Sequence, residues 1–343
     1  MQNLSLKKVS SPIQKKYEKS QALLSSKLVD NELKKVNIFI TNSIKSEVPL
    51  IPLLSDHLLK SGGKRIRPII TILTSKLFNY NYGNRHIKLA SCIELIHMAS
   101  LLHDDVIDES TLRRGKKSAN IIWGNKASIL VGDYLFSKAF QILVEDNDPI
   151  VLKTLAEVSK ALAQGEVMQL GMVNNLDISR EKYFKVIEDK TAKLFSAAAI
   201  VGGIVSDVSD SIISKLKDFG QFMGTSFQIL DDSLDYDLSA TSSGKKIGTD
   251  FKEGKVTLPV LLALEKATHK EKEFWIRTME KLEQNEHDFE YAIELLEKHN
   301  CLIESKMIAA SLSKKAEIII NELPQNIFRD ALLNLVSHNI FKN

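Results

Sequence analysis

Six aspartates in two short stretches are the residues that most clearly carry chemistry. They form a first carboxylate box and, far downstream, a second one with the same spacing: Asp104, Asp105 and Asp108, then Asp231, Asp232 and Asp235. On a helix, residues four apart share a face, so the outer two aspartates of each box lie together. Their like charges repel, and apolar flanks increase that cost. Mg²⁺ suits such a cluster, because it takes one or two carboxylates and bridges to substrate phosphates.

Basic side chains accompany both boxes. A glycine pair is followed by Lys64, Arg65 and Arg67, while other cations lie further along the chain: Arg113, Arg114, Lys190, Lys245 and Lys255. Glycine lets a backbone approach a ligand closely, and arginine forks onto phosphate oxygens. His97 lies two helical turns before Asp104 on the same predicted face. These groups predict that phosphates bind beside the carboxylates.

The spacing of apolar residues predicts the helices that would position these groups. It runs through nearly all of the 343 residues, and no linker interrupts it, so we expect one all-α domain. We predict a helical bundle with a central apolar cavity over 31–343, preceded by a basic arm over 1–30. The first box ends a predicted helix at 84–108, and the second lies in another at 210–237.

Composition narrows the function further. The net charge of +3 is too small to indicate nucleic-acid binding, and two cysteines form no disulfide framework. No run of about 18 apolar residues predicts a membrane span. We expect a cytoplasmic protein, with organellar targeting by the basic arm left open. The chain also lacks a Gly-x-x-x-x-Gly-Lys-Ser/Thr loop and a Cys/His metal pattern.

The charges of the two boxes and the apolar helices around them together indicate the ligand. Two diphosphate groups and about three Mg²⁺ ions would balance the buried charges, since buried charges need partners. Mn²⁺ is the alternative ion. Helices that are apolar around the boxes would enclose a hydrocarbon, with its diphosphate at the rim.

With these features in place, the chain resembles the polyprenyl synthetase family of trans-isoprenyl diphosphate synthases. The resemblance spans roughly 62–259 and rests on eight motifs: Gly62 to Pro68, Glu94 to Asp108, Leu112 to Gly115, Val131 to Leu135, Gln164 to Glu166, Lys190 to Ala192, Phe227 to Asp235, and Gly248 to Pro259. One departure is Lys246, where the family usually has proline, and this puts the geometry of that loop in doubt.

The resemblance implies a role for each matching residue. Both boxes would bind Mg²⁺ and, with Lys190, act directly on the allylic diphosphate. That diphosphate would also be held by Arg113, Thr191, Gln228, Lys245 and Lys255. Isopentenyl diphosphate would be held by Lys64, Arg67, His97 and Arg114, with Arg65 the less certain member.

The resemblance also implies a reaction and an assembly. The allylic C–O bond would ionise with help from the metals, and the double bond of isopentenyl diphosphate would attack the carbocation. The primer would be farnesyl diphosphate, the fold that of the isoprenoid synthases, and the assembly a homodimer. Product release implies loose membrane association.

Two small residues before the first box predict a long product. Ser100 lies one turn before Asp104, and Ala99 is beside it. In short-product members of the family that the chain resembles, a bulky aromatic near these positions closes the tunnel, so the resemblance implies an open tunnel here. Because a cavity bounds the ligand it encloses, we expect about forty to fifty carbons, with octaprenyl diphosphate first, for a quinone side chain. Leu143 and Leu155 are the candidates for the floor. Decaprenyl, solanesyl and shorter geranylgeranyl products are the alternatives.

Other classes of protein remain open at this point. His103-Asp104 is the pair used by HD-type phosphohydrolases, although no histidine accompanies the second box. A non-catalytic subunit of a heteromeric synthase could keep the fold but lose the boxes, which are whole here. A terpene cyclase would not need the cluster from Lys64 to Arg67.

Overall fold

The computed structural model describes residues 27–238 and 247–340, and most of them are helical. The chain begins with α2 (Asp30–Ser43), α3 (Leu50–Lys60) and α4 (Ile66–Leu77). Five long helices follow: α5 (Arg85–Ile107), α7 (Asn125–Asp146), α8 (Pro149–Leu170), α10 (Lys193–Val205) and α11 (Asp210–Leu234). Shorter elements join them: β1 (Leu112–Arg113), β2 (Lys116–Lys117), α6 (Ala119–Trp123), α9 (Arg180–Ile187) and the π-helical turn η1 (Glu188–Ala192).

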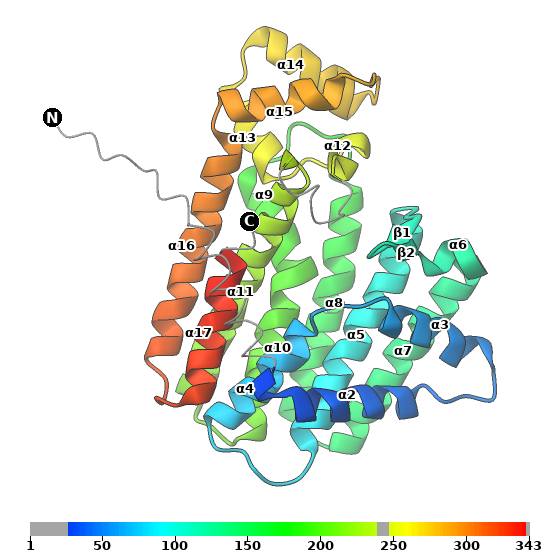
Figure 1. Cartoon of the computed structure of the whole chain (residues 1–343), viewed down its shortest axis with the longest axis vertical. Coiled ribbons are helices and arrows are strands. Elements are labelled where there is room, and N and C mark those ends of the chain that lie inside the picture. The colour runs from blue at the N-terminus through cyan, green and yellow to red at the C-terminus, as the bar shows by residue number, and fades with distance from the viewer. Residues whose placement is uncertain (1–26, 239–246, 341–343) are drawn as a thin grey trace, which may run out of the picture.

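The remaining elements cover one end and one side of this bundle (Figure 1). They are α12 (Thr249–Lys252), α13 (Leu258–Lys266), α14 (His269–Trp275), the π-helical turn η3 (Ile276–Glu280), α15 (Asp288–Lys298), α16 (Cys301–Asn321) and α17 (Ile327–Ile340). Figure 1 shows α14 and α15 across the top, and α16 and α17 along one side. Within the bundle, α5 packs on α7 and α4, while α10 packs on α4, α8 and α11. The predicted all-α bundle is confirmed.

Two apolar clusters form the core, and long helices cross between them. In α11, Phe219 and Met223 belong to the larger cluster, whereas Ile229 and Leu230 belong to the smaller one under α12–α15. The helix α16 also contributes to both clusters. The second carboxylate box therefore lies on α11 where one core gives way to the other.

Glycines allow α11 to approach α10 closely. A Cβ at Gly220 would lie 2.4 Å from Cα of Ser196, and one at Gly224 would lie 2.6 Å from Cα of Ala192. Side chains at these positions would force the backbones apart. This contact fixes α11, and with it the second box, against the helix that follows Lys190.

Local signals explain the turn between α7 and α8. Asn147 takes a left-handed conformation with φ of 55°, and Pro149 begins α8 at the favoured first position. The Asp148 carboxylate accepts hydrogen bonds from the backbone N–H groups of Ile150 (2.8 Å) and Val151 (3.2 Å). These features end α7 and begin α8.

Two segments depart from regular α-helix. The π-helical turn η1 lies between α9 and α10, and the antiparallel β1–β2 hairpin follows α5. Within the described residues, one helix, α7, is long and apolar enough to cross a membrane by length and composition alone. It packs along α5 on one side and carries exposed apolar side chains on the other.

Candidate active site

The first carboxylate box lies at the C-terminal end of α5. Asp104 is in its last turn, and Asp108 caps it. Burial raises the pKa of Asp104 to about 7, against the positive charge of Lys190, which lowers it. One Asp104 oxygen, Oδ1, is buried and has no hydrogen-bond partner. A carboxylate left in this condition is suited to receive a cation.

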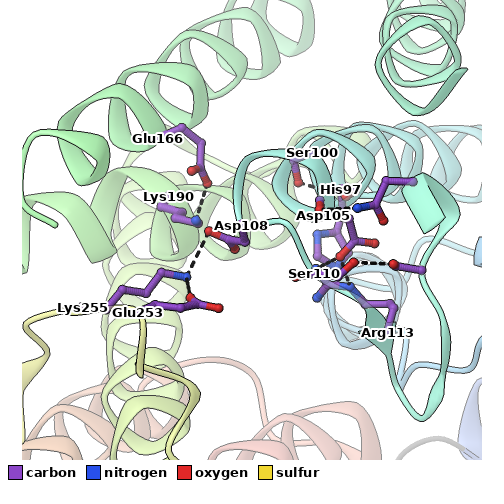
Figure 2. A network of polar contacts seen from close by, with 12 residues as sticks. His97, Ser100, Asp105, Asp108, Ser110, Arg113, Glu166, Lys190, Glu253 and Lys255 are labelled. Carbon is purple, nitrogen blue, oxygen red and sulfur yellow. Dashed lines mark hydrogen bonds and ion pairs between the residues drawn. The ribbon is translucent and has the colours of Figure 1, made fainter. Parts of the chain in front are cut away.

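Asp105, the middle residue of this box, points away from Asp108 and toward Arg113. It is 1% exposed, and its Oδ1 accepts a hydrogen bond from Nε of Arg113 at 2.8 Å. Its backbone carbonyl accepts another from Nδ2 of Asn120 at 3.0 Å. In Figure 2 this pair lies to one side, apart from Asp108. Asp105 thus holds the hairpin that carries Arg113.

The second box is part of a hydrogen-bonded chain. Tyr183 donates its hydroxyl to Asp232 Oδ2 at 2.5 Å, and Gln228 donates its amide to Asp232 Oδ1 at 2.8 Å. Thr191 in turn donates its hydroxyl to Gln228 Oε1 at 2.7 Å. Burial, then the Asp232 charge, raises the pKa of Tyr183 well above its usual value, so the phenol remains a donor. This chain fixes Thr191 relative to the box.

Asp235 secures the segment after the second box. It is buried, and its Oδ2 accepts the backbone N–H of Asp250 at 2.8 Å. Its own backbone carbonyl accepts the N–H of Gly248 at 2.8 Å. Through these two bonds α12 and the residues after it are attached to the end of α11.

Lys255 connects that segment to the first box. Its Nζ lies 3.0 Å from Asp108 Oδ1 and 2.8 Å from Glu253 Oε2 (Figure 2). Burial lowers the pKa of Lys255, but the charges of Asp108 and Glu253 outweigh it and raise the pKa above the usual value. An ammonium group therefore joins the two halves of the site across a sequence distance of about 150 residues.

Lys190 reaches the same space from η1. Its Nζ forms an ion pair with Glu166 (Figure 2). Burial lowers the pKa of Lys190, but the negative charges of Asp104 and Glu166 outweigh this and raise it. Gly165 allows the approach, since a Cβ there would lie 2.9 Å from the backbone N of Lys190. Lys190 lies within the π-helical turn, and turns of this kind are frequent at functional sites.

A basic cluster lies next to the first box. Arg67 is half-buried with its guanidinium 4.6 Å from the centre of the Phe195 ring, and desolvation of that group lowers its pKa to about 10. Burial, then the nearby charges of Arg67 and Arg114, lowers the pKa of His97 well below its usual value. His97 is therefore neutral near pH 7 and can accept or donate one hydrogen bond.

Not every predicted ligand faces this space. Arg65 donates to Glu94 Oε1 and to the Leu59 carbonyl, each at 2.8 Å, and Arg114 donates to the Gly62 carbonyl. Lys245 lies outside the described residues, so its predicted role stays a prediction. The binding roles predicted for the other ligands around the two boxes stay predictions.

The donor set fits Mg²⁺. In the described part of the chain, no three His, Cys, Asp or Glu side chains lie close enough to hold a metal by themselves. Mg²⁺ does not require this, because it is usually held by one or two carboxylates, with waters and phosphate oxygens completing its shell. Asp104, with its unpartnered oxygen, and Asp108 and Asp231 are the residues placed to contribute.

The predicted chain-length residues lie away from the carboxylates along the bundle. Ala99 is fully buried, while Ser100 is half-buried and donates its hydroxyl to the His97 carbonyl at 2.9 Å. Leu143 and Leu155 are buried in the parts of α7 and α8 next to their connecting turn, far along the bundle from the boxes. The roles of these four residues stay predictions.

Sequence reasoning gave no role to several residues that shape the site. Glu166 and Glu94 were within the quoted motifs, but nothing in their spacing revealed the cations they bind. Tyr183 lay outside any recognised pattern, and Glu253 lay within the motif from Gly248 to Pro259 but had no assigned role. His103, the candidate for phosphohydrolase chemistry, faces α7, where its Nε2 is 3.1 Å from the Ile129 carbonyl.

Comparison with known proteins places these features in one family. The polyprenyl synthetase model matches residues 48–296. Octaprenyl diphosphate synthase of Escherichia coli (strain K12) is 39% identical over 310 residues, covering 90% of this chain and 95% of that protein. Geranylgeranyl diphosphate synthase of Saccharolobus solfataricus is 35% identical over 301 residues, covering 86% and 88%. A polyprenyl synthase structure from Caulobacter crescentus, complexed with calcium and isoprenyl diphosphate, has a TM-score of 0.89 and 40% identity, covering 93% and 97%.

The attachment of α12 to α11 can be tested without any substrate. Asp235→Ala removes a charged acceptor, and losing such a bond costs about 1.5–3 kcal/mol. We expect backbone amide exchange over 248–256 to accelerate by tenfold or more, because local opening becomes easier. Hydrogen exchange read by mass spectrometry measures this. The exposed Asp177→Ala is the control, and unchanged exchange in a folded Asp235→Ala protein would contradict the role.

Proposed function

The chain belongs to the polyprenyl synthetase family, and from this we propose that it is a long-chain all-trans polyprenyl diphosphate synthase. It would extend an allylic diphosphate with isopentenyl diphosphate, and octaprenyl diphosphate is the product we favour. One observation carries the proposal: Lys255 bridges to Asp108, so the segment after the second box meets the first box at one site. A relative at 39% identity makes octaprenyl diphosphate by its name, which supports this length.

The residues divide the work between two diphosphates. Lys190, Lys255 and Arg113 would hold the allylic diphosphate beside the boxes, with Thr191 and Gln228 at the reacting end. When bound, Mg²⁺ would neutralise charge that develops on the departing diphosphate. The ammonium groups add fixed positive charge where that negative charge grows.

The second substrate would bind at the basic cluster. Lys64, Arg67, His97 and Arg114 would orient isopentenyl diphosphate so that its double bond faces the allylic carbon. Attack forms the new C–C bond, and a proton then leaves the adjacent carbon for the departing diphosphate. Phe195 and Phe227, with ring centres 5.4 Å apart, contribute apolar surface that keeps water from the cation.

Other classes fit the structure less well. A phosphohydrolase would need imidazole ligands at the carboxylates, but His103 contacts α7 instead. A non-catalytic subunit has no need of intact boxes.

We also propose a cytoplasmic location with loose membrane contact for product release, which cell fractionation would test.

The activity and its metal dependence can be tested together. The purified chain is incubated with farnesyl diphosphate, labelled isopentenyl diphosphate and Mg²⁺, and products are identified by mass spectrometry. Asp104→Ala should lower turnover about a thousandfold or more, since a tenfold change is about 1.4 kcal/mol and an ion acting on the leaving group supplies several. The exposed Glu157→Ala is the control. A variant that kept a tenth of the turnover would refute the role of Asp104.

We propose a homodimer formed through the outer face of α7. Leu130, Phe140 and Val144 share this face and are 67%, 38% and 67% exposed. A second copy would cover these side chains, as an apolar surface of this kind commonly indicates. Sedimentation equilibrium should give twice the chain mass of 38.5 kDa, and Leu130→Glu with Val144→Glu should give the single mass. A wild-type monomer would rule this assembly out.

Product length can be tested at Ser100. Ser100→Phe should block the tunnel about one helical turn, or ~5 Å, from the first box and shorten the product to about fifteen or twenty carbons. Ala99→Phe should act similarly but cost stability, because Ala99 is fully buried. Leu155→Ala should lengthen the product if Leu155 forms the floor. Product mass decides, and unchanged long products from active Ser100→Phe would show that the tunnel runs elsewhere.

A further inference from the structure

The segment before α4 has an unusual backbone. Gly62 and Gly63 have φ of 96° and 139°, and Arg65 has φ of 49°. Glycine adopts such angles easily, but Arg65 has a side chain, and the left-handed region is unfavourable for it. Arg65 is also the N-cap residue, immediately before α4 begins at Ile66. Something must hold this residue in place, because conformations of this kind persist only where the surroundings fix them.

The Arg65 side chain supplies that attachment. Nη1 donates to Glu94 Oε1 and Nη2 donates to the Leu59 carbonyl, each at 2.8 Å. The side chains of Arg65 and Glu94 are 13% and 4% exposed. One guanidinium thus ties the segment both to α5 and to the end of α3. Both ends of its planar fork are occupied by protein atoms.

Glu94 also acts on the neighbouring cations. Burial lowers the pKa of Arg67 to about 10 and that of Arg114 below its usual value, and the charge of Glu94 opposes the fall in both. It lies one helical turn before His97 on α5. Glu94 is therefore a buried carboxylate that binds Arg65 and acts through its charge on Arg67 and Arg114. It links these three arginines electrostatically to α5.

The segment 62–67 also packs closely against Arg114 of the hairpin. Arg114 donates to the Gly62 carbonyl, and a Cβ at Gly63 would lie 2.5 Å from Nη1 of Arg114. A shift of the segment around Arg65 would therefore displace Arg114 too. Lys64 and Arg67, on either side of Arg65, would move with it.

We propose that Arg65 and Glu94 are positioning residues for the isopentenyl diphosphate site, and that Arg65 does not bind the diphosphate itself. This rests on the proposed function. Arg65 holds the left-handed turn that presents Lys64 and Arg67, and Glu94 anchors Arg65 to the helix that carries His97. This changes the expectation from the family resemblance, which placed Arg65 among the phosphate ligands.

A comparison of two substitutions at Arg65 separates the two roles. Arg65→Gly and Arg65→Ala both remove the guanidinium, but glycine adopts φ near 49° without strain and alanine does not. If Arg65 positions the turn, Arg65→Ala should raise KM for isopentenyl diphosphate about tenfold more than Arg65→Gly, a ratio that corresponds to about 1.4 kcal/mol. KM for farnesyl diphosphate should stay within twofold in both, roughly the scatter of such contributions. If Arg65 binds phosphate, the two variants should lose affinity equally.

Glu94→Gln extends the test. It should raise KM for isopentenyl diphosphate, and adding Arg65→Ala should raise it no further, because residues of one network are not additive. The control is Glu271→Gln, which alters another buried glutamate with a cationic partner, Glu271 with the exposed Lys298 at 2.6 Å, on α14 and α15. It should lower the melting temperature and leave both KM values unchanged.

The outcomes separate this inference from the proposed function. Equal KM for Arg65→Gly and Arg65→Ala in an active enzyme, or additive effects of Glu94→Gln and Arg65→Ala, would overturn the positioning role and leave the function intact. A folded wild-type chain that fails to use isopentenyl diphosphate would overturn both.

Discussion

Negative charge gathered at one point is the constraint on which this structure depends. Asp108 ends α5 and Asp235 ends α11, so two helices direct the negative ends of their dipoles toward one site. Their boxes add further carboxylates there, and burial raises the pKa of Asp104 to about 7. Such an arrangement is unfavourable unless cations offset it. Lys255, Lys190 and Arg113 supply positive charge from the protein, and bound Mg²⁺ would add more.

A scaffold that tolerates this cost must be firmly packed elsewhere. The close approach of α10 and α11 at Gly220 and Gly224 fixes the helix of the second box, and α5 is packed between α4 and α7. Because α11 belongs to both apolar clusters, its carboxylates cannot separate from the first box without disturbing a core. The free energy of burial in these clusters thus offsets electrostatic repulsion at their junction.

Sequence patterns predicted the helices and the boxes because both depend on short-range spacing. The helix expected at 84–108 is observed as α5, and the carboxylates lie at its end. What spacing could not give were pairings between distant segments, such as Arg65 with Glu94 or Lys190 with Glu166. These depend on a left-handed residue and a π-helical turn, neither of which has a periodic signature. Asp105 was predicted to share the site face, but its pairing with Arg113 depends on how the hairpin folds back.

The cations of the site differ in how exposed their carboxylate partners are. Arg65 and Arg113 bind Glu94 and Asp105, whose side chains are 4% and 1% exposed, whereas Lys255 binds Glu253, which is 32% exposed. A buried carboxylate that loses its partner is strongly penalised, while a more exposed one can be hydrated instead. Arginine's planar fork is fixed in place by two bonds, but lysine's ammonium on a flexible stem can exchange one oxygen for another. The Arg65 and Arg113 pairs are therefore rigid parts of the site. On the proposed function, the Lys255 ammonium could exchange Glu253 for a phosphate oxygen of the allylic diphosphate, so that its charge would follow that substrate as it binds.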